Sequence, residues 1–328
     1  MSQRHIIEIL KIVIAGTIIT WLLMSGKIDL YAIRYVLTPK SILICWGALF
    51  ISFFLVSVRW QTLIASQGIY VSTKDSIKLS LIGSFFSFVL PGGVSGDAVK
   101  AYYVSKNETN NQNSKQWSSW VSVIVDRYIG ITTLCGIAFL VTLFDYERLK
   151  VGGILSSLQT FLGLILIVLI ILGYLIFSKK RYSQMGRLFR RLDIKFGEKA
   201  VRFFDALHGY GHPGVLAKTS FLSVMGHVVV ICIFAHLGEK MGEAIPIEAY
   251  YYCVPIAMML SSVPIAPGGI GVGQAAYYFV FNVYLGHVSD IGPTLVTIYQ
   301  LIIFSYSLAG AFFYLQLKKT TNLSLEQK

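Results

Sequence analysis

The chain has 328 residues, of which 55% are hydrophobic and only 13% are charged, and its formal net charge is +12. Soluble domains carry about 25% charged residues, so the composition excludes an ordinary soluble protein and indicates a membrane protein. The basic residues gather in residues 179–202 and near the chain ends. That distribution is typical of cytoplasmic loops, so we expect no nucleic-acid partner.

Six apolar segments approach or exceed the roughly 20 residues that a helix needs to cross a bilayer. They are residues 6–25, 41–64, 117–144, 151–177, 216–237 and 291–317. In the first segment the apolar run 12–24 follows Arg4 and Lys11, as in a signal peptide, but no small-x-small cleavage site follows before Lys27, so we expect a retained span. The sequence therefore predicts an all-α polytopic membrane protein with about six transmembrane helices.

Two further apolar stretches, residues 75–106 and 249–286, are each interrupted by a Pro-Gly-Gly break. The first contains LPGGVSGDAVKAYY and the second APGGIGVGQAAYY. Proline lacks an amide donor and glycine adopts backbone angles closed to other residues, so a helix breaks at these sites. The breaks consist of Pro91, Gly92 and Gly93 and of Pro267, Gly268 and Gly269.

Charge gives the expected topology, because residues 179–202 hold nine lysines and arginines against two acids and should be cytoplasmic. Stretch 75–106 then begins and ends inside, stretch 249–286 begins and ends outside, and both termini are cytoplasmic. Two re-entrant hairpins entering from opposite faces would form an inverted repeat, with a binding site near the midplane. Two full crossings by each stretch would leave the other spans unchanged, but the leg 79–90 is short for a crossing and favours re-entry.

This topology divides the chain into three parts. Residues 1–178 form an N-terminal membrane half, residues 179–215 a basic cytoplasmic connector, and residues 216–328 a C-terminal membrane half. Backbone freed at a break must be buried in protein or line a wet cavity. A helix that resumes after the break presents amide donors suited to an anion such as phosphate. The alternative is that Pro-Gly-Gly is merely a tight turn between two helices.

Charged and polar residues close to the breaks are the candidate binding residues. Asp97 and Lys100 share a helix face at i, i+3, either inside the membrane or already at the cytoplasmic surface. Asp126 and Arg127 lie within the third span, where neighbouring residues face different directions and should pair elsewhere. Their pairing would form a buried network or a direct substrate contact.

Two further residues complete the candidate site. Arg59 would pair with Asp126 or Asp97, or extend to the membrane interface beside Trp60. Gln274 follows the second break and is polar but uncharged. The four cysteines stand singly without metal-ligand spacing, and His227 and His236 are typical of packing residues, so we expect no metal or cofactor.

Together, these residues resemble a known family. Arg59-Trp60, residues 90–103, Asp126-Arg127 and PGGIGVGQ over 267–274 are similar to the lysylphosphatidylglycerol synthase transmembrane, or flippase-like, integral membrane family. The resemblance implies two inverted halves with re-entrant hairpins, a prokaryotic plasma membrane, and movement of a lipid or lipid-linked head group between leaflets. Many members carry an acid where this chain has Gln274, so a proton or cation role of that acid is not expected here. The 328 residues leave no room for a soluble aminoacyl-transferase domain, so we do not expect lysyl-lipid synthesis by this chain alone.

Three functions follow as hypotheses. The first is a lipid translocase without nucleotide hydrolysis, whose partner is a membrane lipid with a phosphate-containing head group. The second is an intramembrane transferase acting on a lipid-linked substrate, with Asp97 or Asp126 as base. The third is a scaffolding subunit that docks a lipid synthase through the basic connector, and a homo-oligomer is also compatible with the sequence.

Overall fold

The structure is a computed structural model that describes residues 20, 30–89, 95–107, 113–144, 154–178, 197–242, 245–262 and 267–325. All regular structure in these ranges is helical, which confirms the predicted all-α class. In chain order the helices are α2 (Leu30–Val36), α3 (Pro39–Ala65), α4 (Thr73–Val89), α5 (Ser95–Asn107), α6 (Asn113–Phe144), α8 (Ile154–Phe177), α10 (Gly197–Gly209), α11 (Pro213–Lys240), α12 (Ile247–Ser261), the 3₁₀ turn η1 (Pro267–Gly269), α13 (Val272–Leu285) and α14 (Ile291–Leu325).

Five helices are long and apolar enough to cross a membrane. These spans are Pro39–Ala65, Gln116–Phe144, Ser157–Phe177, Pro213–Lys240 and Ile291–Gln316. They coincide with five of the six predicted spans, and the sixth, residues 6–25, lies outside the described residues. The chain is therefore an integral membrane protein.

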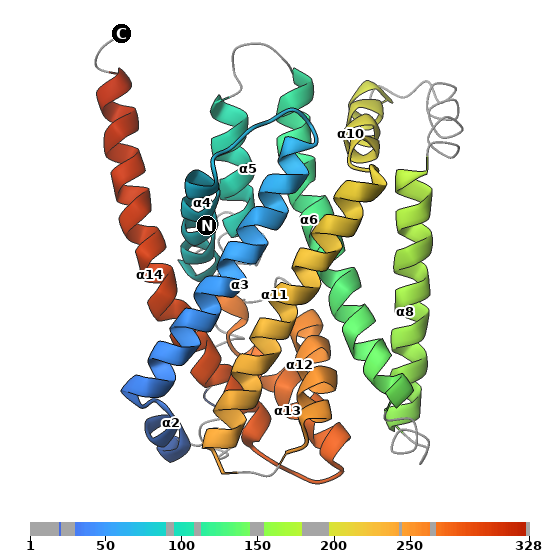
Figure 1. The fold of residues 1–328 in the computed structure, drawn as a ribbon, viewed down its shortest axis with the longest axis vertical. Helices are drawn as coiled ribbons and strands as arrows, with labels where there is room; N and C mark the ends of the chain where they lie inside the picture. Colours follow the sequence, from blue (N-terminus) through green and yellow to red (C-terminus); the bar gives the residue numbers. More distant parts are fainter. Residues whose placement is uncertain are drawn as a thin grey trace, which may run out of the picture.

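Local sequence explains where two of these spans begin. Thr38 precedes α3, and its side-chain oxygen accepts a hydrogen bond from the amide of Ser41 at 3.2 Å. Pro39 and Pro213 occupy the first helical positions of α3 and α11, where a missing amide donor costs nothing. The cap and the prolines define the starts of α3 and α11, which lie at opposite ends of the bundle (Figure 1).

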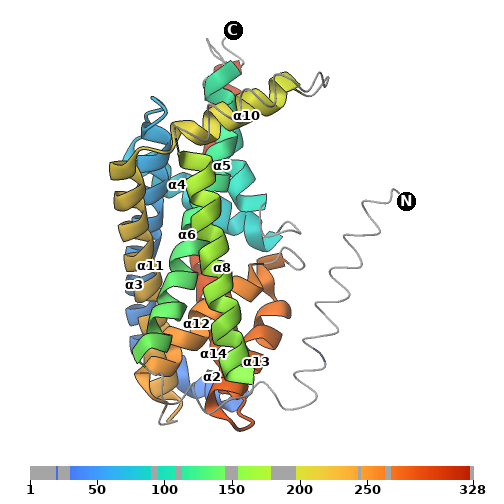
Figure 2. The ribbon, with the colours of Figure 1, turned by 90° about the vertical axis from the view of Figure 1, so that its right-hand side faces the viewer.

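Four shorter helices form two pairs, α4 with α5 and α12 with α13, and the helices of each pair contact each other. They have 17, 13, 15 and 14 residues, or roughly 20–26 Å of helix at 1.5 Å per residue, less than the roughly 30 Å hydrocarbon core. Figures 1 and 2 show the α4/α5 pair in the half of the molecule near α10 and the α12/α13 pair in the half near α2. The limits of the two pairs agree within two residues with the predicted stretches 75–106 and 249–286.

Glycines allow these short helices to pack backbone against backbone. A Cβ on Gly96 of α5 would overlap the carbonyl oxygen of Gly83 in α4, and a Cβ on Gly310 of α14 would overlap the carbonyl oxygen of Leu81. Small residues at helix contacts are the usual means of association in membranes, where burial in lipid gives no hydrophobic driving force. The α4/α5 pair is thereby fixed against α14.

Gly268 of the second break contacts Phe88, which lies near the C-terminal end of α4. Gly268 has φ +59°, and a Cβ there would lie 2.6 Å from the ring of Phe88. The Phe88 ring also meets Phe304 of α14 edge to face, with ring centroids 5.6 Å apart. Pro91, Gly92 and Gly93 lie outside the described residues, so the first break is located only by the ends of α4 and α5.

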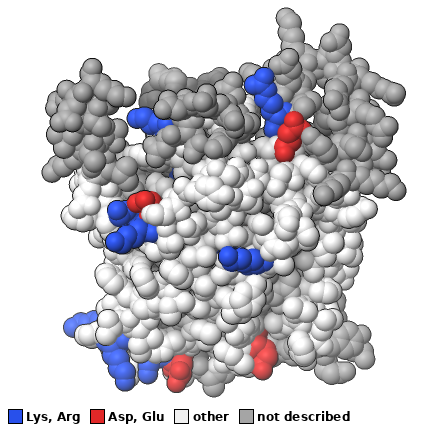
Figure 3. Space-filling view, turned by 45° about the horizontal axis from the view of Figure 1, so that its top comes forward, with Lys and Arg blue, Asp and Glu red and all other residues white. Residues whose placement is uncertain are grey.

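The surface of the bundle has the charge distribution of a membrane protein. Figure 3 shows charged side chains at both ends of one face, and a mostly uncharged surface between them that is interrupted by a mixed cluster at the left and by one basic patch near the centre. Of the five described spans, α8 is the least buried within the protein. Helix α10 lies across one end of the bundle (Figure 2) and packs against α6 and α8.

Candidate functional site

A three-residue charged cluster lies where α5 contacts α6. Asp97 is the third residue of α5, and its Oδ1 lies 3.0 Å from Nζ of Lys100, one turn further along. Arg127 of α6 donates to Oδ2 of Asp97 from Nη2 at 2.7 Å and from Nε at 2.8 Å. Nζ of Lys100 lies 5.8 Å from the ring centroid of Trp60. Two cations share one carboxylate, which leaves this cluster with a net charge of +1.

The cluster is enclosed but remains reachable. The side chains of Asp97 and Arg127 are 22% and 31% exposed, while that of Lys100 is 8% exposed. Lys100 lies against Oδ1 of Asp97 and Arg127 against Oδ2, so cations engage both carboxyl oxygens. Asp97 is therefore a carboxylate, and the positive charge that remains belongs to the two basic side chains.

A second, buried ion pair joins α3 to α6. Arg59 donates from Nε and Nη2 to the two oxygens of Asp126, each at 2.7 Å, and both side chains are less than 9% exposed. Of the partners expected for Arg59, the structure selects Asp126, and the burial of the guanidinium excludes an extension to the membrane interface. The bidentate geometry fixes the rotation of α6 relative to α3.

Helix α11 joins this ion pair through hydroxyl groups. Arg59 Nη1 donates to Oγ of Ser223 at 2.8 Å. The same oxygen lies 2.7 Å from Oγ1 of Thr133 and 3.2 Å from Nε2 of His227. His227 is also 3.2 Å from the carbonyl oxygen of Gly130. The network ties α3, α6 and α11 together, and neither Ser223 nor Thr133 was identified from the sequence.

Asp126 and Arg127 face different neighbours, as expected for adjacent residues of a helix. Asp126 belongs to the buried network, and Arg127 belongs to the cluster with Asp97. The two groups therefore lie side by side on α6, one enclosed by spanning helices and the other beside the α4/α5 pair.

Gln274 forms hydrogen bonds that connect the residues around the second break. It is the third residue of α13, is 2% exposed, and accepts a hydrogen bond at 2.7 Å from the amide of Gly271, the N-cap residue. Its amide nitrogen donates to Oε1 of Gln300 at 2.7 Å and to Oγ1 of Thr297 at 3.2 Å. Gln300 in turn donates to the carbonyl oxygen of Gly268 at 3.3 Å. A glutamine fits this position because it donates and accepts at once.

The sequence did not identify Gln300 or Thr297. A weak signal exists, since the two are polar residues at i, i+3 inside a predicted span. Of the twelve predicted site residues, the structure brings Asp97, Lys100 and Arg127 into one cluster and Arg59 and Asp126 into another. Gly268, Gly269 and Gln274 lie at the second break, where Pro267 begins η1.

Comparison with known proteins gives the family. The profile of a family described as "Lysylphosphatidylglycerol synthase TM region" matches residues 9–310. The chain belongs to this family. Its description names the membrane region of a lipid synthase, which associates the family with membrane lipids. The chain is also 26% identical over 148 residues to UPF0104 membrane protein PH1989 of Pyrococcus horikoshii, and this match covers 43% of each chain.

Proposed function

We propose that this family member is a lipid translocase that moves a phospholipid or lipid-linked head group between leaflets without nucleotide hydrolysis. The observation that carries the proposal is the cluster in which Lys100 and Arg127 share Asp97. Ionisable side chains are expensive within a membrane and usually serve function. A partly exposed cluster with two basic side chains suits a phosphate-bearing head group, because guanidinium and ammonium groups form strong hydrogen bonds with phosphate.

The arrangement of the helices supports a path for the head group. We propose that α4/α5 and α12/α13 are re-entrant hairpins entering from opposite faces of an inverted repeat. In this topology the contact of Phe88 with Gly268 is where the hairpins meet, between the membrane half of residues 1–178 and that of residues 216–328. Acyl chains would remain in lipid while the head group passes the cluster, with both termini and the connector 179–215 on the cytoplasmic side.

The two ion pairs argue against the transferase hypothesis. A general base must offer a carboxylate oxygen to the proton that it abstracts from the substrate. Arg59 instead engages both oxygens of Asp126, and Lys100 and Arg127 engage the two oxygens of Asp97. Both carboxylates are therefore arranged as ion-pair partners, which does not suit the role of base. No observation favours the scaffolding hypothesis, since residues 179–196 of the connector lie outside the described residues.

Translocation is tested in proteoliposomes that contain phosphatidylglycerol with a fluorescent head-group label. Dithionite quenches the label only on lipids of the outer leaflet, so later loss of fluorescence reports movement from the inner leaflet. Arg127→Gln removes one cation and Asp97→Asn removes the carboxylate that both cations share. We expect each variant to slow head-group movement at least about tenfold, since a hydrogen bond to a charged group contributes about 1.5–3 kcal/mol.

Lys218→Gln is the matched control, because Lys218 is an exposed basic residue of α11 outside both clusters. It should move lipid at the wild-type rate. Unchanged rates in both Arg127→Gln and Asp97→Asn, with correctly folded protein, would refute the proposal.

A further inference from the structure

A cavity of about 880 Å³ lies at the end of the bundle opposite α10, between α2, the first turn of α3 and the last turn of α11. Its walls are mainly basic, hydroxyl-bearing and aromatic, and six of the residues that line it are Arg34, Tyr35, Lys40, Ser41, His236 and Lys240. The cavity is separate from the Asp97 cluster and the second break, and no hypothesis above uses it.

The cavity concentrates positive charge. Arg34, Lys40 and Lys240 are exposed and form no ion pair with an acid of the described residues. No aspartate or glutamate of the described chain lines the walls. Three unneutralised cations around one hollow attract an anion.

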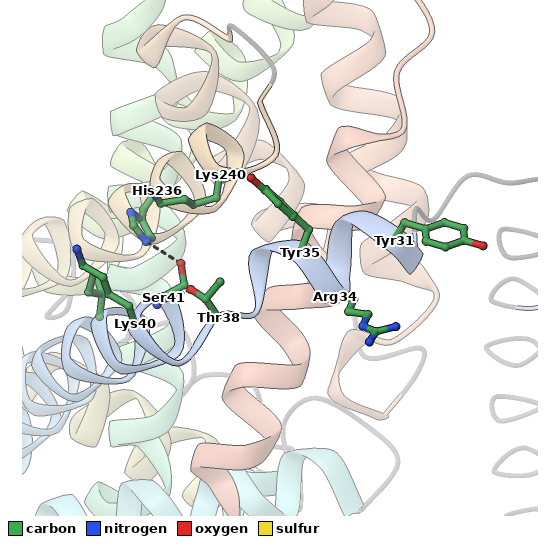
Figure 4. A pocket seen from close by; sticks show the side chains of 9 residues that line it. Tyr31, Arg34, Tyr35, Thr38, Lys40, Ser41, His236 and Lys240 are labelled. Atoms are coloured by element: carbon green, nitrogen blue, oxygen red, sulfur yellow. Dashed lines mark hydrogen bonds between the residues drawn. The ribbon is translucent and has the colours of Figure 1, made fainter.

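Polar contacts organise the floor of the cavity. The Oγ of Ser41, which is 2% exposed, lies 3.2 Å from Nε2 of His236 and links α3 to α11. Figure 4 shows Lys40 on one side of this pair and Lys240 with the hydroxyl end of Tyr35 on the other. Hydroxyl, imidazole and ammonium groups therefore line the same cavity, and such groups suit an anion with several acceptor oxygens.

An apolar surface continues from the cavity along α3. Ile44 lines the cavity and is 45% exposed, its neighbour Leu43 is 74% exposed, and Phe50 and Ile51 farther along the helix are 53% and 52% exposed. Because α3 spans the membrane, these side chains face lipid, and the cavity at its start lies at head-group depth. A ligand with a phosphate and acyl chains matches both parts, whereas a soluble anion would use only the first.

We propose that this cavity binds the phosphate of an anionic phospholipid in the leaflet at the α2 end, with the acyl chains along α3. Binding there does not depend on translocation by the protein. The proposal therefore stands or falls separately from the proposed function.

A photocrosslinker at position 44 tests the site directly. The protein carrying p-benzoylphenylalanine in place of Ile44 is reconstituted in phosphatidylcholine vesicles with phosphatidylglycerol as a minority lipid, irradiated, and analysed by mass spectrometry. We expect phosphatidylglycerol to be enriched among crosslinked lipids on the order of fivefold over its share of the bilayer, since each basic residue near an anionic surface contributes about 1 kcal/mol. The double change Lys40→Gln with Lys240→Gln should abolish the enrichment, and Lys218→Gln should leave it unchanged.

Two outcomes would overturn the proposal. One is crosslinking at position 44 in the same lipid ratio as the bilayer. The other is equal enrichment in the protein with and without Lys40→Gln and Lys240→Gln. If inorganic phosphate bound to the cavity, as seen by phosphorus NMR, without lipid enrichment, the cavity would be a soluble-anion site and the lipid assignment would be wrong.

Discussion

Asp97 and Gln274 occupy the same position, the third residue of the helix that follows each break, and yet their contacts differ. Gln274 forms hydrogen bonds with Gly271 beside the second break and with Gln300 of α14, so it stabilises the backbone at the second break. Asp97 forms ion pairs with Lys100 and Arg127, so it positions these two basic side chains. An ionised carboxylate at position 274 would lack the donor that Oε1 of Gln300 receives from the amide of Gln274.

Replacing Gln274 with glutamate should destabilise the protein. The ionised carboxylate loses the donated hydrogen bonds and is buried, and an unsatisfied buried group costs about 1–3 kcal/mol or more when charged. Burial raises the pKa of a carboxyl introduced there above its unfolded value. Stability is then retained at low pH, where the protonated group donates, and is lost as pH rises through the folded pKa.

The measurement is thermal unfolding of Gln274→Glu and wild type in detergent across a pH series. Gln274→Met, which cannot titrate, is the matched control and should show the pH dependence of wild type. Equal pH dependence of Gln274→Glu and Gln274→Met would contradict the role assigned to Gln274.

At the scale of elements, the α4/α5 pair is held by backbone contacts that only glycine permits. Gly310→Ala places a methyl group on the carbonyl of Leu81 and should force α14 away from α4. We expect a loss of about 1–3 kcal/mol, the usual cost of overpacking, measured as a lower midpoint of thermal unfolding in detergent.

Gly47→Ala is the control for that change. Gly47 lies in α3 and has nothing within 4 Å of a Cβ, so alanine there should raise stability by up to about 1 kcal/mol through helix propensity. If both substitutions lower the midpoint equally, the close approach of α14 to α4 is not what makes Gly310 necessary.

Much of this architecture could be predicted, because apolar length and Pro-Gly-Gly breaks are local signals. The five described spans and the limits of both short pairs followed from them. The pairing of charged and polar side chains, in contrast, depends on contacts between helices that are distant in sequence. From the sequence, Asp126 and Asp97 were equally suitable partners for Arg59. The hydrogen bond between Arg59 and Ser223 joins residues more than a hundred positions apart, and the bond between Gln300 and Gly268 joins residues about thirty positions apart. Uncharged polar residues in apolar spans give little sequence signal, so these contacts were missed.

At the scale of the whole molecule, the re-entrant topology is the main expectation that labelling can decide. Val288 and Tyr70 are 70% and 85% exposed and lie in loops at opposite ends of the bundle. In a Cys232→Ser background, Val288→Cys should react with an impermeant maleimide in intact cells, and Tyr70→Cys only after permeabilisation. Phe88→Cys, at the end of α4, should not react from outside, because a re-entrant helix ends within the membrane. Labelling of Phe88→Cys in intact cells would mean that α4 crosses completely.

Helix α6 carries the buried pair and the exposed cluster on adjacent residues, and this fixes which parts can move. Breaking a buried ion pair costs about 3–5 kcal/mol, so α6 stays joined to α3 and α11 through Asp126. Any rearrangement that releases Arg127 must then come from α5, whose hold on α6 includes the partly exposed Asp97. In any rearrangement we therefore expect α3, α6 and α11 to stay together, and the Asp97–Arg127 ion pair to be the contact through which α5 separates from α6.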